Sequence, residues 1–506
     1  MATMISPLRR AVQVGARRPA VRCGATELSY AEMWERCRRL AAALQDMGLE
    51  PGDRVGVVSA NCHRYLEVYQ AVPAAGMVLV PLNQRHTDAE LHYALEDAGA
   101  KALFAGRPTA DLPSCVRHVL DLGDGYERIL AGAEPVDDLG GGVLEEDLAG
   151  LFYTGGTTGA SKGVMLTHRN LVSNAMHLQM CWPFGPDTCW LVTAPLFHLA
   201  GSIAVLSTIW NAGRQVMLSA FDPGMVLDLV ERERVTATLV VPSMLAAMNE
   251  EQLARPRDVS SLRLISFGGA PSATETLRRA HRAFPGARLL HIYGATETAP
   301  IATTMLGVER VLETPQAGSC GQPAVGVEVE VRTPDGRPAA AGEVGEVVVR
   351  GPNVMGAYWN KPDHTAAVLR DGWYSTGDLG YLDEEAYLYL VDRAKDMIVT
   401  GGENVYSTEV EDVLYRHPAV LEAAVFAVPD ERWGEAVHAV VVPRPDATPT
   451  EDALVAWCRE AIAAYKVPKR IDVRAEGLPK SGAGKVLKRA LRAPFWAGRE
   501  ASVSGA

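Results

Sequence analysis

The alternation of apolar and polar residues in the N-terminal part of the chain predicts helices separated by short strands. Ser29 and Glu32 have the spacing of a helix capping box. Four apolar residues then recur on one helical face: Met33, Cys37, Leu40 and Leu44. Short apolar runs typical of buried strands follow at 55–58, 78–80 and 102–104, and helical patterns lie between them. Strands that alternate with helices predict parallel sheets with helices on their faces.

The pattern changes twice in the second half of the chain. Glycine-rich turns and short strands at 327–331, 346–350 and 387–391 predict a compact β-rich subdomain. Beyond residue 396 helices and strands are mixed again. The elements expected there are a helix capped at 408–411, strands at 420–428 and 437–442, and a helix marked by Leu454, Cys458 and Ile462.

These patterns predict an α/β fold in two domains. The chain has 506 residues, which exceeds the size at which one hydrophobic core stops growing. We expect residues 1–394 to form a large N-terminal domain of parallel-rich sheets flanked by helices, with the β-rich subdomain at its end. Residues 395–506 are expected to form a small α+β C-terminal domain.

Composition and charge narrow the class of protein. A net charge of -12 argues against nonspecific binding to nucleic acid or to anionic membranes. No apolar run reaches the roughly 20 residues of a membrane span, and the N-terminus lacks the apolar core of a secretory signal. The cysteines are scattered without a CxxC pair, which favours reduced thiols in a cytoplasmic protein over disulfides or zinc. The sequence leaves the oligomeric state open, a homodimer included.

The segment 153–164 has the composition of a phosphate-binding loop. Its glycines allow backbone N–H groups to close on an anion, its threonine hydroxyls donate hydrogen bonds, and Lys162 adds a positive charge. It is not a Walker loop, because no glycine directly precedes Lys162. A Gly/Ser/Thr loop alone is usually an ordinary surface loop. The density of donors and the expected placement between a strand and a helix favour phosphate binding here.

This segment resembles the signature loop of the acyl-adenylate-forming superfamily, which includes acyl-CoA synthetases, peptide-synthetase adenylation domains and firefly luciferase. Further motifs follow in the family's order as far as Lys485, so the resemblance covers nearly the whole chain. The loop residues implied to bind ATP are Thr154, Gly155, Gly156, Thr157, Thr158, Gly159 and Lys162. Three residues depart from the family pattern, in which serine, proline and proline are common: Gly155, Ser161 and Ser407. We expect the first departure to tune the loop rather than disable it.

The segment 291–298 resembles the family's second signature, which holds adenine and magnesium. The residues implied to bind ATP are Ile292, Tyr293, Gly294 and Thr296. Glu297 and Thr154 are the implied ligands of Mg²⁺. A carboxylate beside a polyphosphate makes chemical sense with a divalent cation between them. Taken alone, the Thr-Glu pair would more simply begin a helix.

Two further segments resemble nucleotide-binding motifs. The loop at 266–271 resembles the one that closes over adenine and borders the acyl pocket, and its implied ATP contacts are Gly269, Ala270 and Pro271. Without the family, a plain strand-to-helix turn explains this loop equally well. In the segment 374–378, Asp378 matches the family's ribose-binding aspartate, and Arg393 matches the arginine that reaches the same ribose. A lone Gly-Asp pair is usually a turn.

The resemblance implies that the C-terminal domain is mobile. Lys395 has the position of the hinge about which this domain swings between two half-reactions. Gly401, Gly402 and Glu403 match the loop that lines the pantetheine tunnel for CoA, and the same residues also fit a turn between a strand and a helix. Lys485 matches the catalytic lysine, whose ammonium would stabilise the charge that builds on the phosphoryl oxygens. In isolation, this lysine would be a solvated loop residue.

The segment 190–210 contains no Asp, Glu, Lys or Arg, which predicts an apolar slot for a hydrophobic acid. Part of this run also fits a plain core. It lacks the aspartate that would hold a substrate ammonium, and an unpaired buried ammonium is costly. The resemblance implies an acyl pocket lined by His198, Leu199, Gly201, Ser202 and Gly268. His198 would gate or orient the carboxylate and complete the catalytic set with Lys485 and Glu297, although a lone histidine can equally be a core residue.

The resemblance implies an acyl-CoA synthetase of the bacterial fatty-acyl or aryl branch, with ATP, Mg²⁺ and CoA as cofactors. A hydrophobic fatty, aryl or polycyclic acid would form an acyl-adenylate and then a thioester with CoA, releasing pyrophosphate and AMP. The chain ends soon after Lys485, which we take to leave no room for a fused carrier domain. Two alternatives stay open. One is a ligase that loads a separate carrier protein. The other is a non-catalytic adenylate sensor, against which the intact Lys485, Glu297 and Asp378 argue.

Overall fold

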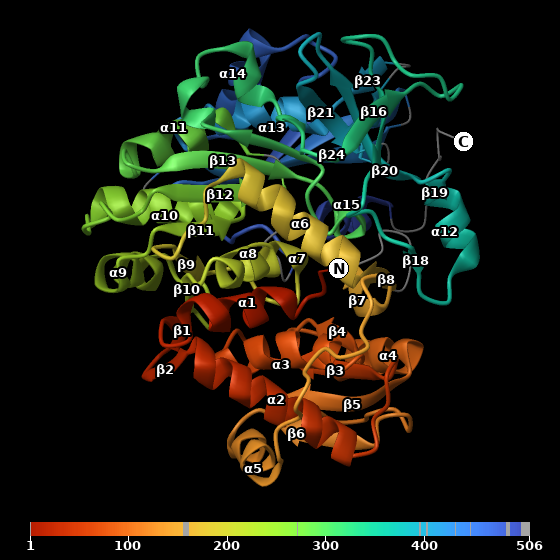
Figure 1. Ribbon diagram of the computed structural model, residues 1–506. Helices are drawn as coiled ribbons and strands as arrows, with labels where there is room; N and C mark the ends of the chain where they lie inside the picture. Colours follow the sequence, from red (N-terminus) through yellow and green to blue (C-terminus); the bar gives the residue numbers. More distant parts are fainter. Residues whose placement is uncertain are drawn as a thin grey trace.

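The structure is a computed structural model, and its described residues form four β-sheets with helices on their faces (Figure 1). These residues are 2–154, 161–270, 272–393, 396–400, 403–430, 432–445, 447–481 and 486–496. The expected α/β class, with a large N-terminal and a small C-terminal domain, is confirmed.

A seven-stranded sheet, at the bottom of Figure 1, carries the start of the expected phosphate loop. In spatial order its strands are β18 (Ala357–Tyr358), β8 (Lys162–Thr167), β7 (Leu148–Thr154), β4 (Val78–Leu82), β3 (Arg54–Val58), β5 (Ala100–Ala105) and β6 (His118–Asp121). The five strands from β7 to β6 pair in parallel, whereas β8 and β18 are antiparallel additions at the edge.

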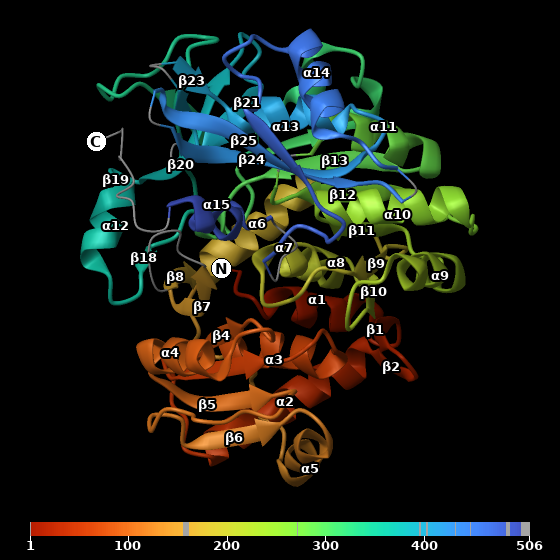
Figure 2. The ribbon, with the colours of Figure 1, turned by 180° about the vertical axis from the view of Figure 1, so that it is seen from behind.

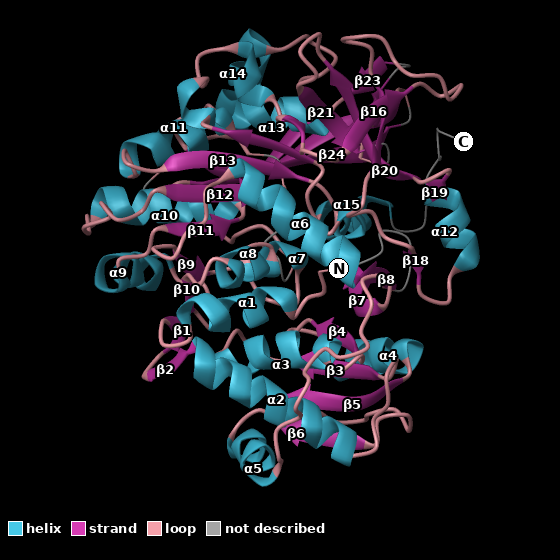
Figure 3. Ribbon diagram, in the orientation of Figure 1, coloured by secondary structure: helices cyan, strands magenta, loops and turns pink. Residues whose placement is uncertain are grey.

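Alternate residues of these strands face two different hydrophobic cores. Val78 and Val80 share a core with Leu91 of α4 (Asp88–Ala98), whereas Leu79 shares a core with Leu66 of α3 (His63–Ala74). The helix α2 (Tyr30–Asp46) packs against α3 and against α5 (Asp124–Gly132), and α5 lies at the bottom of the view in Figure 3. The helix α2 begins with the expected capping box, since Ser29 and Glu32 bond each other's backbone N–H groups.

A nine-stranded sheet forms the middle of the molecule. In spatial order its strands are β15 (Gln322–Pro323), β14 (Thr303–Leu306), β13 (Arg288–Tyr293), β12 (Leu264–Gly268), β11 (Ala237–Val240), β9 (Cys189–Val192), β10 (Arg214–Met217), β1 (Pro19–Cys23) and β2 (Thr26–Ser29). The six strands from β13 to β1 are parallel. One face packs on α9 (Pro223–Glu233), α10 (Pro242–Ala254) and α11 (Thr274–Ala283). The other packs on α6 (His168–Cys181), α7 (Leu199–Ser202) and α8 (Val205–Trp210), while α1 (Ser6–Gly15) lies against α8.

The expected β-rich subdomain is a five-stranded sheet. Its strands are β16 (Glu328–Arg332), β17 (Gly345–Arg350), β20 (Trp373–Leu382), β19 (Leu369–Arg370) and β21 (Leu388–Arg393), and α12 (Pro362–Val368) precedes β19. All of its strand pairs are antiparallel. The last strand ends at the expected domain boundary.

The C-terminal part has a sheet and a hydrophobic core of its own (Figure 2). Its elements are β22 (Ile398–Thr400), β23 (Glu403–Val405), α13 (Ser407–Tyr415), β24 (Val420–Asp430), β25 (Gly434–Pro443), α14 (Glu451–Ala461), β26 (Arg470–Val473) and α15 (Lys488–Trp496). The cap expected at 408–411 is wrong, because the Thr408 hydroxyl donates to the Val391 carbonyl and α13 has no side-chain cap. Arg444 of this part binds Glu250 of α10 at 2.6 Å.

A buried ion pair joins α2 and α3. Glu67 is 0% exposed, and its carboxylate lies 2.8 Å from Arg36 Nε and accepts a hydrogen bond of 2.7 Å from the Tyr126 hydroxyl. The Arg36 guanidinium also binds Glu127, at 2.9 Å. A buried carboxylate needs such partners, because the loss of its hydration is expensive. This network therefore fixes the packing of three helices, α2, α3 and α5.

We expect the Arg36→Ala variant to be destabilised by about 3–5 kcal/mol, because it leaves the Glu67 carboxylate buried without a cation. Urea denaturation followed by fluorescence measures the shift of the transition that reports the N-terminal domain. Arg255→Ala is the control, since Arg255 makes only an exposed pair with Glu251. An equal shift in both variants would contradict the importance of the buried pair.

Candidate nucleotide and acyl-binding site

The expected phosphate loop joins two antiparallel strands. β7 ends at Thr154 and β8 begins at Lys162, and these residues are cross-strand partners. The expected placement between a strand and a helix is therefore wrong, because α6 begins only after β8. Val164 and Leu166 are buried on one face of β8, which is the alternation of a strand. Residues 155–160 of the loop lie outside the described part of the chain, and five of them are expected ATP contacts: Gly155, Gly156, Thr157, Thr158 and Gly159.

Side chains from other elements fix both ends of this hairpin. Tyr153 donates a hydrogen bond of 2.8 Å to Asp97 Oδ2, and Lys361 binds Asp97 Oδ1 at 3.1 Å. Lys162 Nζ lies 4.5 Å from the centre of the Tyr358 ring. An ammonium above an aromatic face is attracted by the ring quadrupole. The positive charge of Lys162 is thus held at the edge of the loop where a phosphate would bind.

Glu297 lies in the single 3₁₀ turn Thr296–Thr298 that follows β13. Its carboxylate is 8% exposed and accepts a hydrogen bond of 2.6 Å from the Tyr358 hydroxyl. It forms no ion pair with any cationic side chain that the structure describes. A buried carboxylate without a cation is costly. Its chemistry therefore fits a Mg²⁺ site, to which Thr154 would add a hydroxyl oxygen.

The two residues expected to hold the ribose are neighbours in the β-rich subdomain. Asp378 in β20 and Arg393 in β21 are direct cross-strand partners. The Tyr293 hydroxyl, at the end of β13, donates a hydrogen bond of 2.9 Å to Asp378 Oδ2. The side chain of Arg393 lies outside the described part. The expected adenine and ribose residues Tyr293 and Asp378 therefore meet in the fold, although they belong to different sheets.

Two glycines assigned to the acyl pocket are also required by the backbone. A Cβ at Gly268 would lie 2.1 Å from the carbonyl oxygen of Ile292, across the β12–β13 pair. A Cβ at Gly201 would lie 2.0 Å from the carbonyl oxygen of Pro195. Both distances are too short for a contact between a carbon and an oxygen atom, so only glycine fits at these two positions. The close approach of the backbone therefore explains both glycines, whether or not an acid binds beside them.

The uncharged segment 190–210 begins in β9, includes α7 and ends with α8. Leu199 and Ser202 are buried, and Ser202 is hydrogen-bonded to Tyr69 of α3. Burial lowers the pKa of His198 to about 4, so its imidazole is neutral near pH 7. Its Nε2 is buried and has no hydrogen-bond partner among the described atoms. A neutral ring nitrogen of this kind can accept from or donate to a substrate group.

The loop after β12 and the C-terminal motifs are described only in part. Gly269 and Ala270 directly follow β12, and Ile292, Gly294 and Thr296 lie at or just after the end of β13. Glu403 is exposed at the start of β23, which pairs with β22. The expected residues that lie outside the described part are Pro271, Lys395, Gly401, Gly402 and Lys485. Lys480 and Val486 flank the last of these as an antiparallel bridge.

Sequence reasoning missed Tyr358 and Asp97, which bind residues of the expected site. Tyr374 hydrogen-bonds the Tyr358 hydroxyl. For Tyr358 the available signal was the aromatic pair at 358–359 within a glycine- and proline-containing stretch.

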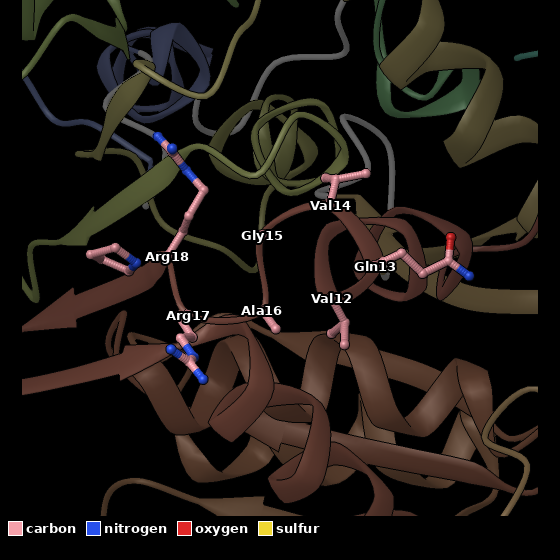
Figure 4. A pocket seen from close by; sticks show the side chains of 8 residues that line it. Val12, Gln13, Val14, Gly15, Ala16, Arg17 and Arg18 are labelled. Carbon is pink, nitrogen blue, oxygen red and sulfur yellow. The ribbon is translucent and has the colours of Figure 1, made fainter.

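The hollow between α1 and β1, shown in Figure 4, is separate from the nucleotide and acyl residues. Figure 4 shows Arg17 and Arg18 pointing to opposite sides of the turn between the two elements. The guanidinium of Arg18 donates to the carbonyl oxygens of Pro186 and Ala212. Arg18 therefore ties the start of β1 to neighbouring loops.

Known proteins confirm the class that the fold and these residues indicate. Residues 8–359 match the AMP-binding enzyme family, and residues 409–485 match the AMP-binding enzyme C-terminal domain. The chain is 42% identical over 490 residues to a feruloyl-CoA synthase of an Amycolatopsis sp, which covers 97% of this chain and 98% of the relative. It is 36% identical to a medium/long-chain-fatty-acid–CoA ligase of Mycobacterium tuberculosis, over 95% of this chain and 88% of the relative.

ATP-bound MatB from Rhodopseudomonas palustris has the same fold, with a TM-score of 0.87 at 32% identity over 98% of this chain and 99% of that one. The chain therefore belongs to the AMP-binding enzyme family. Within this family it is an AMP-forming carboxylic acid–CoA ligase that uses ATP, Mg²⁺ and CoA. The expected superfamily and its CoA-synthetase branch are thereby confirmed. In the part of the chain that the structure describes, no helix has the length and apolarity needed to span a bilayer.

We expect acid to destabilise the protein partly through His198. Its pKa is about 4 in the folded chain, whereas an unfolded histidine binds a proton near pH 6.5. Both states are neutral above pH 6.5, so stability falls only as the pH drops from about 6.5 towards 4. The melting temperature of His198→Gln should therefore fall less between pH 7.5 and 5.0 than that of the wild type. His364→Gln, at an exposed position, is the control and should behave as the wild type does.

Proposed function

We propose that this chain joins CoA to a hydrophobic aromatic acid of the arylpropenoate class, to which ferulate belongs. The proposal rests on the 42% identity with feruloyl-CoA synthase across 97% of the chain. The uncharged segment 190–210 supports it, since a neutral aromatic ring needs apolar surroundings and no ammonium partner. The segment also contains an aromatic side chain beside His198, because the ring centre of Phe197 lies 4.7 Å from that of His198.

For the adenylation step, the proposal assigns the phosphates to the loop 154–162 and the ribose to Asp378 and Arg393. An oxygen of the substrate carboxylate attacks the α-phosphorus of ATP, and the bond from that phosphorus to the bridging oxygen breaks to release pyrophosphate. Lys485 and Lys162 stabilise the negative charge that develops on the phosphoryl oxygens. Bound Mg²⁺ would neutralise phosphate charge beside Glu297 and Thr154. His198 orients the carboxylate through its neutral ring.

For the thioester step, the proposal assigns motion to residues 395–506 about Lys395. The rotation withdraws Lys485 and brings Gly401, Gly402 and Glu403 to the substrate side. The CoA sulfur then attacks the adenylate carbonyl carbon, its proton passes to solvent, and AMP leaves with the bonding electrons of the acyl–oxygen bond. A hydrophobic core separate from that of the N-terminal domain supports independent motion of this part.

The proposal also includes a cytoplasmic location and a homodimeric assembly. All eight cysteines are unpaired in the structure, which suits a reducing compartment. The homodimer is the simplest closed assembly. Sedimentation of the purified chain tests it directly, and a single species at the monomer mass would remove this part of the proposal.

The decisive experiment compares acids at fixed ATP, Mg²⁺ and CoA by the release of pyrophosphate and the formation of acyl-CoA. We expect ferulate and 4-coumarate to exceed dodecanoate and a steroid carboxylate in kcat/KM by about 10-fold or more, the discrimination that a shaped apolar pocket supplies. Preference for dodecanoate would contradict the aromatic class. Acyl transfer only to a phosphopantetheinyl carrier protein, with none to CoA, would contradict the acceptor.

We expect Lys485→Ala to separate the two half-reactions. Adenylation should fall by about 100-fold or more, because the charge on the transferring phosphoryl group loses its ammonium. Thioester formation from a supplied acyl-adenylate should stay near the wild-type rate. Lys469→Ala, which removes an exposed lysine of the same domain, is the control and should preserve both steps. Equal losses in both half-reactions of Lys485→Ala would contradict the proposal that Lys485 acts in adenylation and is withdrawn for thioester formation.

A further inference from the structure

Tyr358 is buried between the expected magnesium ligand and the phosphate-loop lysine. It is 5% exposed and forms the end of the two-residue strand β18. Its hydroxyl contacts Glu297, and its ring face lies against Lys162. We propose that Tyr358 is a positioning residue that holds Glu297 for Mg²⁺ and Lys162 for phosphate at the same time. This inference rests on the proposed magnesium role of Glu297.

The hydroxyl of Tyr358 has one direction in which to donate. An ionised carboxylate can only accept hydrogen bonds, so the Tyr358 hydroxyl is the donor to Glu297, and Tyr374 contacts the same hydroxyl. The bond to Glu297 is 2.6 Å long and goes to Oε1. A carboxylate held by one oxygen keeps its plane and rotamer, and the other oxygen is then presented in a constant direction. Hydrogen bonds to metal-ligating side chains orient them in this way in metal sites generally.

The ring of Tyr358 performs the second part of the positioning. Lys162 Nζ is 4.5 Å from the ring centre, which is the geometry of a cation–π contact. A lysine side chain has four rotatable bonds, so an isolated ammonium would sample many positions. The aromatic face restricts it without neutralising its charge. A carboxylate partner would restrict it too, but it would compete with the phosphate for the ammonium.

Tyr358 can position other groups because it is itself fixed from several sides. Its backbone pairs with Val164 of β8, and its N–H donates to the Thr365 hydroxyl at 3.0 Å. A few residues earlier, Met355 N–H donates to the carbonyl oxygen of Glu297 at 2.8 Å. The tyrosine, the lysine strand and the glutamate turn therefore form one bonded unit of three chain segments.

The test is the Tyr358→Phe variant of the full-length chain, which deletes one oxygen atom and keeps the ring. We expect the Mg²⁺ concentration for half-maximal adenylation to rise about 10–100-fold, the usual effect of removing a partner of a metal ligand. Electron paramagnetic resonance of Mn²⁺ in the presence of ATP should show a matching loss of bound metal, which reports the site without turnover. ATP binding measured in EDTA should stay as in the wild type, because the ring still holds Lys162.

A second variant, Tyr358→Leu, removes the ring as well. We expect it to show the same rise in the Mg²⁺ requirement as Tyr358→Phe and, in addition, to bind ATP about 10-fold more weakly in EDTA, because Lys162 is no longer restrained. ATP binding equal to that of Tyr358→Phe would overturn the role of the ring.

The matched control is Tyr126→Phe, which deletes a buried tyrosine hydroxyl bonded to the buried Glu67 outside this site. It should leave the Mg²⁺ dependence unchanged even where it lowers the melting temperature. A similar Mg²⁺ shift in both Phe variants would overturn the proposal, since general loosening would then explain it. If Tyr358→Phe binds Mg²⁺ and Mn²⁺ as the wild type does while Glu297→Gln binds them more weakly, the positioning role of Tyr358 is overturned and the magnesium role of Glu297 stands. Unchanged metal binding in Glu297→Gln would instead overturn the magnesium assignment of Glu297.

Discussion

The pairing of β18 with β8 is the constraint on which the proposed nucleotide site depends. Only two residues form β18, yet they join the segment 353–358 to the strand that begins with Lys162. The same segment is joined to the turn of Glu297, because Asn353 donates to the carbonyl oxygens of Thr298 and Ile301, both at 2.6 Å. Strand pairing and the side-chain amide of Asn353 thus bring groups that are far apart in sequence to one place. Their side chains would need little further ordering when a nucleotide binds.

Burial keeps a histidine neutral in each half of the proposed site, His198 on the acyl side and His291 on the adenine side. On the acyl side, the segment 190–210 has no charged residue, and desolvation lowers the pKa of His198 to about 4. On the adenine side, His291 stacks on Phe267 with ring centres 4.7 Å apart, and burial lowers its pKa to about 4 as well. Cationic charge therefore comes from lysine and arginine, which keep it at neutral pH. An uncharged acyl side suits an acid whose only ionised group is the one that reacts.

The sequence predicted what depends on local pattern and missed what depends on distant pairing. The capping box at Ser29 was predictable because its residues are adjacent in the chain. The strand Lys162–Thr167 was not, because it is short and the helical pattern behind it dominates the window. Motifs located Asp378 and Arg393 but could not show that they are cross-strand partners. Tyr358 gave no periodic signal at all, since a two-residue strand has no period and its value lies in contacts with remote segments.

The domain boundary shows how a departure from the family pattern can acquire a structural role. Ser407 N–H donates to Asp392 Oδ2 at 2.6 Å, a bond that the proline common at this position could not make. Lys488 of α15 donates to the Ser407 hydroxyl at 2.6 Å and pairs with Glu411 at 2.7 Å. Asp392 belongs to the strand that ends in the ribose arginine, whereas its partners belong to the C-terminal part. The proposed rotation about Lys395 would separate these two sides, and it would then have to exchange these buried bonds for others of similar strength. On that proposal, the free-energy difference between the two domain positions depends on this polar cluster as well as on the substrates.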